Sequence, residues 1–209
     1  MFKGFNCLFS SFLAMSFAYF IPFTKIYGSW ISYFSWSSIV APVASYHFGI
    51  LSVFSIIFCK SLLSPQRFLL FFALKRLPLI VSSWAFSSKN WITSLFVPAV
   101  CMLLFMVHPV GGQAFYYSFY WLIPMILYFV PTSIASRSLS STFIAHAIGS
   151  VVWLYFKGLG VEVWQLLMPI VIVERLLMAT GMVGIHYLIK GVKQIYKHAI
   201  IQVKAARNL

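Results

Sequence analysis

The chain has 209 residues, of which 62% are hydrophobic and only 8% are charged. A soluble domain has roughly a quarter of its residues charged, so this composition excludes an ordinary soluble protein. The acids are Glu162 and Glu174 alone, with no aspartate, which excludes paired-aspartate catalysis, aspartyl phosphates and carboxylate clusters around a divalent metal. We therefore expect an all-α, polytopic integral membrane protein that forms a single domain over residues 1–209.

The net charge of +13 comes from 15 Lys and Arg residues that stand between long apolar runs. This placement is typical of membrane topology signals, so nucleic acid is not expected as a partner. Cys7, Cys59 and Cys101 lie inside apolar runs without metal-ligand spacing. We interpret them as small buried hydrophobic residues.

The apolar runs predict about six transmembrane helices of about 20 residues each. Residues 5–23 lack a clean signal-peptide cleavage pattern, so we expect a retained helix. Residues 30–58 are too long for one straight span and contain Pro42, which favours a kinked helix or two pieces that meet near residues 42–46. The later spans are expected at residues 91–107, 114–130, 140–156 and 163–189.

Residues 68–86 are apolar but carry Lys75, Arg76 and Pro78 at their middle. A spanning helix would place two cations at the bilayer centre, and each would cost a few kcal/mol. An interfacial segment is therefore favoured over a transmembrane one. The alternative, with eight spans, requires these buried cations.

The positive charges agree with six spans and two cytoplasmic termini, because cytoplasmic loops of membrane proteins are enriched in Lys and Arg. In this topology only Lys25 and Lys157 lie outside, and Arg175 lies within the last span. The cations on the inside are Lys3, Lys60, Arg67, Lys75, Arg76, Lys89, Arg137, Lys190, Lys193, Lys197, Lys204 and Arg207.

The last cations belong to a basic cytoplasmic tail at residues 190–209, where they follow roughly one helical face. The favoured interpretation is a positive face that rests on anionic lipid, at about 1 kcal/mol per charge. A docking surface for a cytoplasmic partner is the alternative.

Ionisable residues inside the predicted spans are the first candidates for a solute site. Glu174 and Arg175 lie near the middle of the last span, where charged groups face the protein interior or a water-filled cavity. They form either a structural pair or a site in which Arg175 meets an anionic group. His146 lies near the middle of the preceding span, on a face with Thr142 and Ser150 that is also suited to helix packing.

A loop at residues 108–113 supplies further candidates. Its two glycines permit close approach to a ligand, and His108 and Gln113 are polar. Tyr120 and Trp121 follow at greater depth and are pocket candidates, whereas Tyr116 and Tyr117 are interpreted as an interfacial aromatic belt. A second loop, at residues 157–162, is interpreted as a tight turn.

Enzyme motifs are absent from the sequence. It contains no HExxH zinc motif, no GxSxG nucleophile elbow and no P-loop. The five histidines are scattered without ligand spacing. We therefore expect no enzymatic activity, no catalytic residue, no metal site and no cofactor.

Ala14 and Ala18 form an Ala-x-x-x-Ala pattern in the first predicted helix, and small residues at this spacing let another helix approach closely. With about six spans in a chain near 200 residues, the sequence resembles the substrate-binding S components of energy-coupling factor vitamin transporters. The resemblance implies that Ala14 and Ala18 dock on a coupling transmembrane subunit, which acts with ATPase subunits. It also implies a vitamin site near the outer face. The residues implicated are His108, Gln113, Tyr120, Trp121, His146, Glu174 and Arg175.

The sequence thus predicts a multi-pass protein of the cell inner membrane that binds and transports a small anionic or aromatic solute, such as a vitamin, with partner subunits supplying energy. A stand-alone proton-coupled secondary carrier is the first alternative. An intramembrane enzyme without a recognisable motif is the second.

Overall fold

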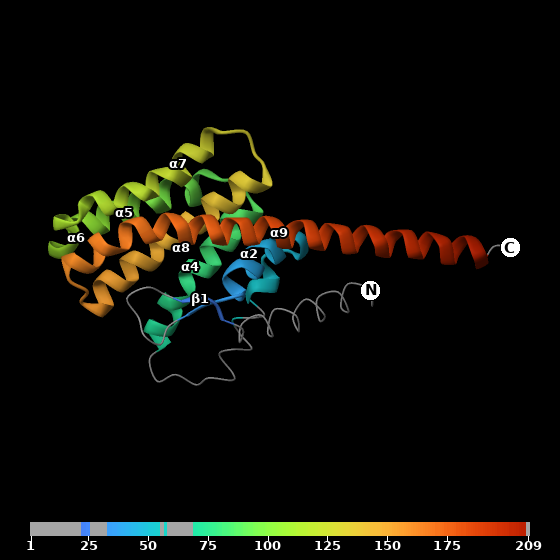
Figure 1. Cartoon of the computed structure of the whole chain (residues 1–209), viewed down its shortest axis with the longest axis horizontal. Helices are drawn as coiled ribbons and strands as arrows, with labels where there is room; N and C mark the ends of the chain where they lie inside the picture. Colours follow the sequence, from blue (N-terminus) through green and yellow to red (C-terminus); the bar gives the residue numbers. More distant parts are fainter. Residues whose placement is uncertain (1–21, 26–32, 55–56, 58–68, 208–209) are drawn as a thin grey trace.

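The computed structural model describes residues 22–25, 33–54, 57 and 69–207. These residues are predominantly helical, as predicted, and their helices gather around α8 (Figure 1). The all-α class is confirmed, and a small antiparallel hairpin accompanies the helices. It pairs β1 (Pro22–Lys25) with β2 (Tyr33–Ser35).

The predicted span at residues 30–58 is broken, but not at Pro42. Helix α2 (Ser37–Phe48) passes through Pro42 and ends at Gly49, whose φ of 87° lies in a region that glycine adopts without strain. Residues 51–54 are helical again after this break. Gly49, and not the proline, therefore divides the apolar run.

The apolar runs at residues 91–107 and 114–130 form a helical hairpin. The first contains the π-helix η1 (Ile92–Phe96) and α5 (Val97–Val107), and the second contains the 3₁₀-helix η2 (Phe115–Trp121) and α7 (Leu122–Phe129). Between them the expected loop forms a short helix, α6 (Pro109–Gln113), with His108 as its N-cap.

Helices α8 and α9 are longer than the spans predicted for them. Helix α8 (Ile134–Lys157) starts at a capping box between Ser133 and Ser136, and it ends at Gly158 with φ 60°. After the predicted turn, α9 runs without interruption from Val161 to Arg207. At 1.5 Å per residue its 47 residues extend about 70 Å, so the predicted tail continues the last helix (Figure 1).

Of the described helices, α8 and α9 are long and apolar enough to cross a membrane, by length and composition. The segments Ile92–Val107 and Phe115–Phe129 are shorter apolar helices. The count of six spans and the cytoplasmic termini stay predictions. The first predicted span, at residues 5–23, lies outside the described residues.

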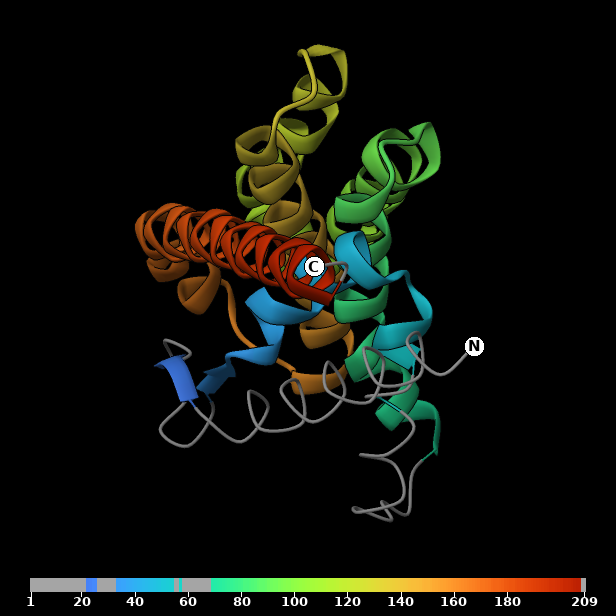
Figure 2. The same cartoon turned by 90° about the vertical axis from the view of Figure 1, so that its right-hand side faces the viewer.

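Helix α4 (Leu69–Ser87) corresponds to the segment predicted to be interfacial. It packs along α8 on one side and α2 on the other (Figure 2). Serines allow close approach here, since Ser141 Oγ donates to the Ser82 carbonyl at 2.8 Å and Ser45 Oγ donates to the Ser83 carbonyl at 2.7 Å. Arg76 is buried within this packing, while Lys75 is exposed. The interfacial position itself stays a prediction.

Candidate functional site

A group of aromatic rings lies inside the bundle where η2, α8 and α9 meet, with Tyr117 at its centre. Tyr117 is 1% exposed. Its ring centroid lies 5.1 Å from that of Trp164, 5.4 Å from that of His146 and 6.5 Å from that of Trp121. We call Tyr117, Trp121, His146 and Trp164 the Tyr117 cluster.

Three buried nitrogen atoms of this cluster make no hydrogen bond within the described part of the chain. They are the indole Nε1 atoms of Trp121 and Trp164 and Nε2 of His146. A buried polar group without a partner costs about 1–3 kcal/mol, so such groups are few in folded proteins. Their concentration around one tyrosine indicates a place where a ligand can supply acceptors.

A buried ion pair lies beside the cluster. Arg175 Nη2 donates to Glu174 Oε2 at 3.2 Å, and the two side chains are 3% and 15% exposed. Arg175 lies close enough to Tyr117 and His146 for its charge to act on both. The predicted pairing of Glu174 with Arg175 therefore forms, and it does so next to the unpartnered nitrogens.

The structure unites most, but not all, of the residues predicted for the site. Trp121, His146, Glu174 and Arg175 belong to the cluster or to its ion pair. Tyr120 lies at the edge: its ring centroid is 6.0 Å from that of Tyr117, and its hydroxyl donates to the Met168 carbonyl at 3.0 Å. This bond joins η2 to α9.

The two polar residues of the predicted loop make local contacts instead. His108 Nδ1 accepts from the Val110 N–H at 3.2 Å, and its ring meets Tyr155 at a centroid distance of 4.9 Å. Gln113 is exposed and donates to the Pro109 carbonyl. Both residues therefore stabilise the α5–α6 connection.

Two members of the cluster, Tyr117 and Trp164, were not predicted as site residues. Tyr117 was expected in an interfacial aromatic belt, but η2 turns it into the protein interior together with Trp121, four residues later. Trp164 lies at the start of the last apolar run and was not singled out. The α-helical spacing rule could not have found Tyr117, because η2 is a 3₁₀-helix, in which residues three apart share a face.

A second polar contact joins α2 to α9 farther along the bundle. Lys193 Nζ lies 3.3 Å from His47 Nδ1, and His47 Nε2 lies 3.1 Å from His186 Nδ1. An ammonium group can only donate, so His47 accepts at Nδ1 and its Nε2–H donates to His186. The two rings stack at 4.8 Å between centroids. Among the described residues, no group of three or more His, Cys, Asp or Glu side chains could hold a metal.

Comparisons of the chain with protein-family models, with curated proteins and with solved structures found no match. The chemistry of the Tyr117 cluster therefore carries the functional argument. Indole N–H groups and a guanidinium donate hydrogen bonds, and flat rings offer stacking surfaces. Such a site suits a small ligand that is rich in acceptor oxygens or is aromatic.

Proposed function

We propose that this chain is a multi-pass subunit of the cell inner membrane that binds a small anionic or aromatic solute at the Tyr117 cluster and takes part in its transport. The observation that supports this proposal best is the group of unpartnered nitrogens on Trp121, Trp164 and His146, which lie around one buried ring beside Arg175. Ligand sites are mostly apolar with a few polar groups that fix orientation, and this cluster has that composition.

The electrostatics favour a carboxylate or phosphate on the solute. Arg175 is always charged and offers a planar set of donors that matches such groups. The nearest acid, Glu174, occupies one side of the guanidinium at 3.2 Å. A solute anion would bind Arg175 and the indole N–H groups while its flat part stacks among Tyr117, Trp164 and Phe105, whose ring centroid lies 5.1 Å from that of Trp164.

The transport step would move the solute across the bilayer by reorientation of the subunit or by rocking of its helices. In support, α8 and α9 are long and apolar enough to cross a membrane, and both line the cluster. Partner subunits would supply energy through a coupling subunit docked on Ala14 and Ala18. Both alanines lie outside the described residues.

A stand-alone proton-coupled carrier is the second candidate. The buried and unpartnered Nε2 of His146 favours it, because a histidine within a membrane protein can serve as a proton site. Glu174 is the other residue that could carry the proton. In this version, transport depends on the proton gradient and needs no ATPase.

An intramembrane enzyme, by contrast, would turn over its substrate in detergent without any partner.

The proposal is tested by purifying the full-length protein in mild detergent from its native host and identifying the proteins and small molecules that accompany it by mass spectrometry. A co-purifying transmembrane subunit with ATPases supports the energised transporter. The chain alone, in a preparation that preserves other complexes, favours the carrier.

The solute found is then used in binding measurements on variants. We expect Arg175→Gln to weaken binding by about tenfold or more, since a charged hydrogen bond contributes about 1.5–3 kcal/mol. Arg137→Gln is the matched control, because Arg137 donates to the Phe86 and Ser87 carbonyls at the end of α4. Equal binding by Arg175→Gln and the wild type would exclude the Tyr117 cluster as the site.

A further inference from the structure

A small pocket lies beside the turn that leads from α7 into α8 (Figure 1). Its other wall comes from the connection between α4 and η1. The enclosed volume is about 20 Å³, which is room for about one water-sized group. We call it the Arg137 pocket. Two cations and four aliphatic hydroxyl groups line it, from Lys89, Ser94, Thr132, Ser136, Arg137 and Ser140.

The two cations of the pocket contact only uncharged oxygens. Lys89 Nζ donates to the Val130 carbonyl at 2.7 Å. Arg137 Nη1 donates to the Phe86 and Ser87 carbonyls at 2.8 and 3.1 Å. A lysine has three N–H donors and an arginine has five, so both side chains keep donors for a further partner. Their positive charges are not neutralised by these contacts.

The two acids of the chain lie away from the pocket. Glu174 pairs with Arg175, and Glu162 lies in the first turn of α9, after α8 has ended. Arg137 lies in the first turn of α8, whose 24 residues extend about 36 Å, so Glu162 is at the far end of that helix. The positive end of the α8 dipole adds to the charge near Arg137. An anion from outside the chain is therefore the group that can balance this charge.

Hydroxyl groups without partners complete the set of donors. Ser94 is 4% exposed, and its hydroxyl makes no hydrogen bond within the described residues. The Thr132 and Ser140 hydroxyls likewise have no partner in the part of the chain that the structure describes. Buried polar groups without a partner are few in folded proteins. The Ser94 hydroxyl in particular indicates a ligand that offers an acceptor inside the pocket.

We propose that the Arg137 pocket binds a phosphate group. A phosphate presents several acceptor oxygens and a charge that guanidinium and ammonium groups both recognise. One oxygen fills the enclosed volume and accepts from Ser94, while the others remain at the open side near Lys89 and Arg137. The site is separate from the Tyr117 cluster, since Arg137 precedes His146 on α8 by nine residues, or about 14 Å. It therefore does not depend on the proposed solute transport.

The phosphate group has two possible sources, a phospholipid headgroup and free phosphate. Helix α8 is long and apolar enough to cross a membrane, and in that case the pocket at its first turn lies at the depth of the headgroups. Exposed apolar side chains also neighbour the pocket along the chain, since Trp91, Phe96 and Phe129 are 58%, 55% and 78% exposed. Lipid tails would cover these side chains. These features favour the phospholipid.

The test measures both sources on the purified full-length protein. Native mass spectrometry shows whether added phosphatidylglycerol stays bound, with a diacylglycerol of the same chains, which lacks phosphate, as the control lipid. Melting curves in sodium phosphate and in sodium chloride of equal ionic strength detect free phosphate, because a ligand of the folded state raises the melting temperature. We expect retention of the phospholipid and not of the diacylglycerol. A melting shift in phosphate without lipid retention would identify free phosphate as the ligand of the same site.

A serine substitution tests the site without removing a structural contact. Ser94→Ala deletes a hydroxyl that has no partner among the described residues, so the variant should fold normally and bind phosphate several-fold more weakly. Ser83→Ala is the matched control, because the Ser83 hydroxyl is also buried and unpartnered in the described part of the chain but lies outside the pocket. It should bind as the wild type does.

Charge removal completes the design. Lys89→Gln should weaken binding by about tenfold, whereas Lys197→Gln, which removes the same charge from an exposed position on α9, should not. The proposal is overturned if neither phosphate source binds, if the diacylglycerol is retained equally, if binding survives Ser94→Ala and Lys89→Gln, or if Lys197→Gln weakens it as much.

The phosphate site and the solute site can fail independently. Arg175→Gln should weaken solute binding and leave phosphate binding unchanged, and Arg137→Gln should do the reverse. Loss of the proposed solute site would therefore leave a positive phosphate result intact.

Discussion

The indole N–H groups of Trp121 and Trp164 can show whether the Tyr117 cluster is a ligand site or ordinary core packing. The rings of Trp121 and Trp164 are 0% and 1% exposed and pack as any core aromatic does, with Phe105 against both at about 5 Å between centroids. Packing alone requires the rings and not their N–H groups. Removing only the N–H group therefore separates the two roles.

Trp164→Phe makes this separation. We expect the variant to bind the solute several-fold more weakly, since a hydrogen bond to a ligand contributes about 1 kcal/mol. Without solute, its melting temperature should fall only by the amount that the smaller buried ring explains. The substitution adds no further cost, because it also removes a buried donor that has no partner. Isothermal titration and a melting curve give the two values. Trp91→Phe, at a 58% exposed position, is the control, and unchanged affinity in Trp164→Phe would contradict the donor role.

The histidine pair on α2 and α9 predicts a stability effect of a different kind. His186→Ala removes the acceptor for His47 Nε2–H and the stacked ring, so we expect a loss of about 1 kcal/mol or more. In a protein of about 200 residues this lowers the melting temperature by about 2–4 °C. Differential scanning measurements in detergent check this value. His198→Ala, at an exposed position near the end of α9, should leave the melting temperature unchanged. Equal melting of both variants would show that the His47–His186 contact does not stabilise the fold.

At the scale of elements, two glycines have opposite expected effects when substituted. A Cβ on Gly111 would collide with the Phe105 carbonyl, whereas nothing lies within 4 Å of a Cβ on Gly184 inside α9. Gly111→Ala should therefore destabilise the α5–α6 turn by a kcal/mol or more, while Gly184→Ala should stabilise α9 by up to about 1 kcal/mol. Thermal melting of both variants tests the prediction, and a stable Gly111→Ala protein would contradict this turn geometry.

The elements also show which features a sequence can predict. Long apolar runs mark α8 and α9 well, because composition and length alone decide whether a helix can cross a bilayer. The break at Gly49 was missed because Pro42 is the stronger helix-breaking signal in isolation, yet α2 accommodates it. The position of Tyr117 was also missed, since whether a ring faces lipid or protein depends on neighbours from α8 and α9. The buried positions of Arg175 and of His146 Nε2 were predictable, because ionisable groups stand out in any apolar run.

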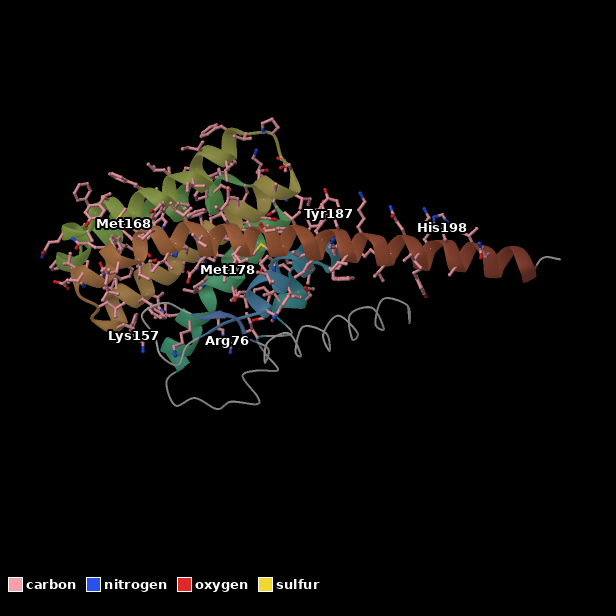
Figure 3. All side chains as sticks on the ribbon, in the orientation of Figure 1. Arg76, Lys157, Met168, Met178, Tyr187 and His198 are labelled. Carbon is pink, nitrogen blue, oxygen red and sulfur yellow. The ribbon has the colours of Figure 1, made fainter. Side chains whose placement is uncertain are left out.

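At the scale of the whole molecule, the predicted topology has a direct test. Lys157 at the end of α8 and His198 in the last part of α9 lie toward opposite ends of the structure (Figure 3). We expect Lys157→Cys to react with a membrane-impermeant maleimide in intact cells, and His198→Cys to react only after permeabilisation. Cys101 is buried, and labelling of the unmodified protein measures the background from all 3 native cysteines. Labelling of both positions from the same side would exclude a crossing by α9.

Helix α9 carries the Glu174–Arg175 ion pair and the histidine contact to α2, and it then continues past the rest of the bundle (Figure 1). Because a rigid helix transmits a tilt along its length, a tilt of α9 about Arg175 would grow toward its C-terminal end. The distance from Arg175 to Arg207 is 32 residues, or about 48 Å at 1.5 Å per residue. A tilt of about 5° at Arg175 thus displaces the far end by about 4 Å. If α9 crosses the membrane and a solute tilts it slightly at Arg175, the far end of the helix would move by this larger distance on the other side.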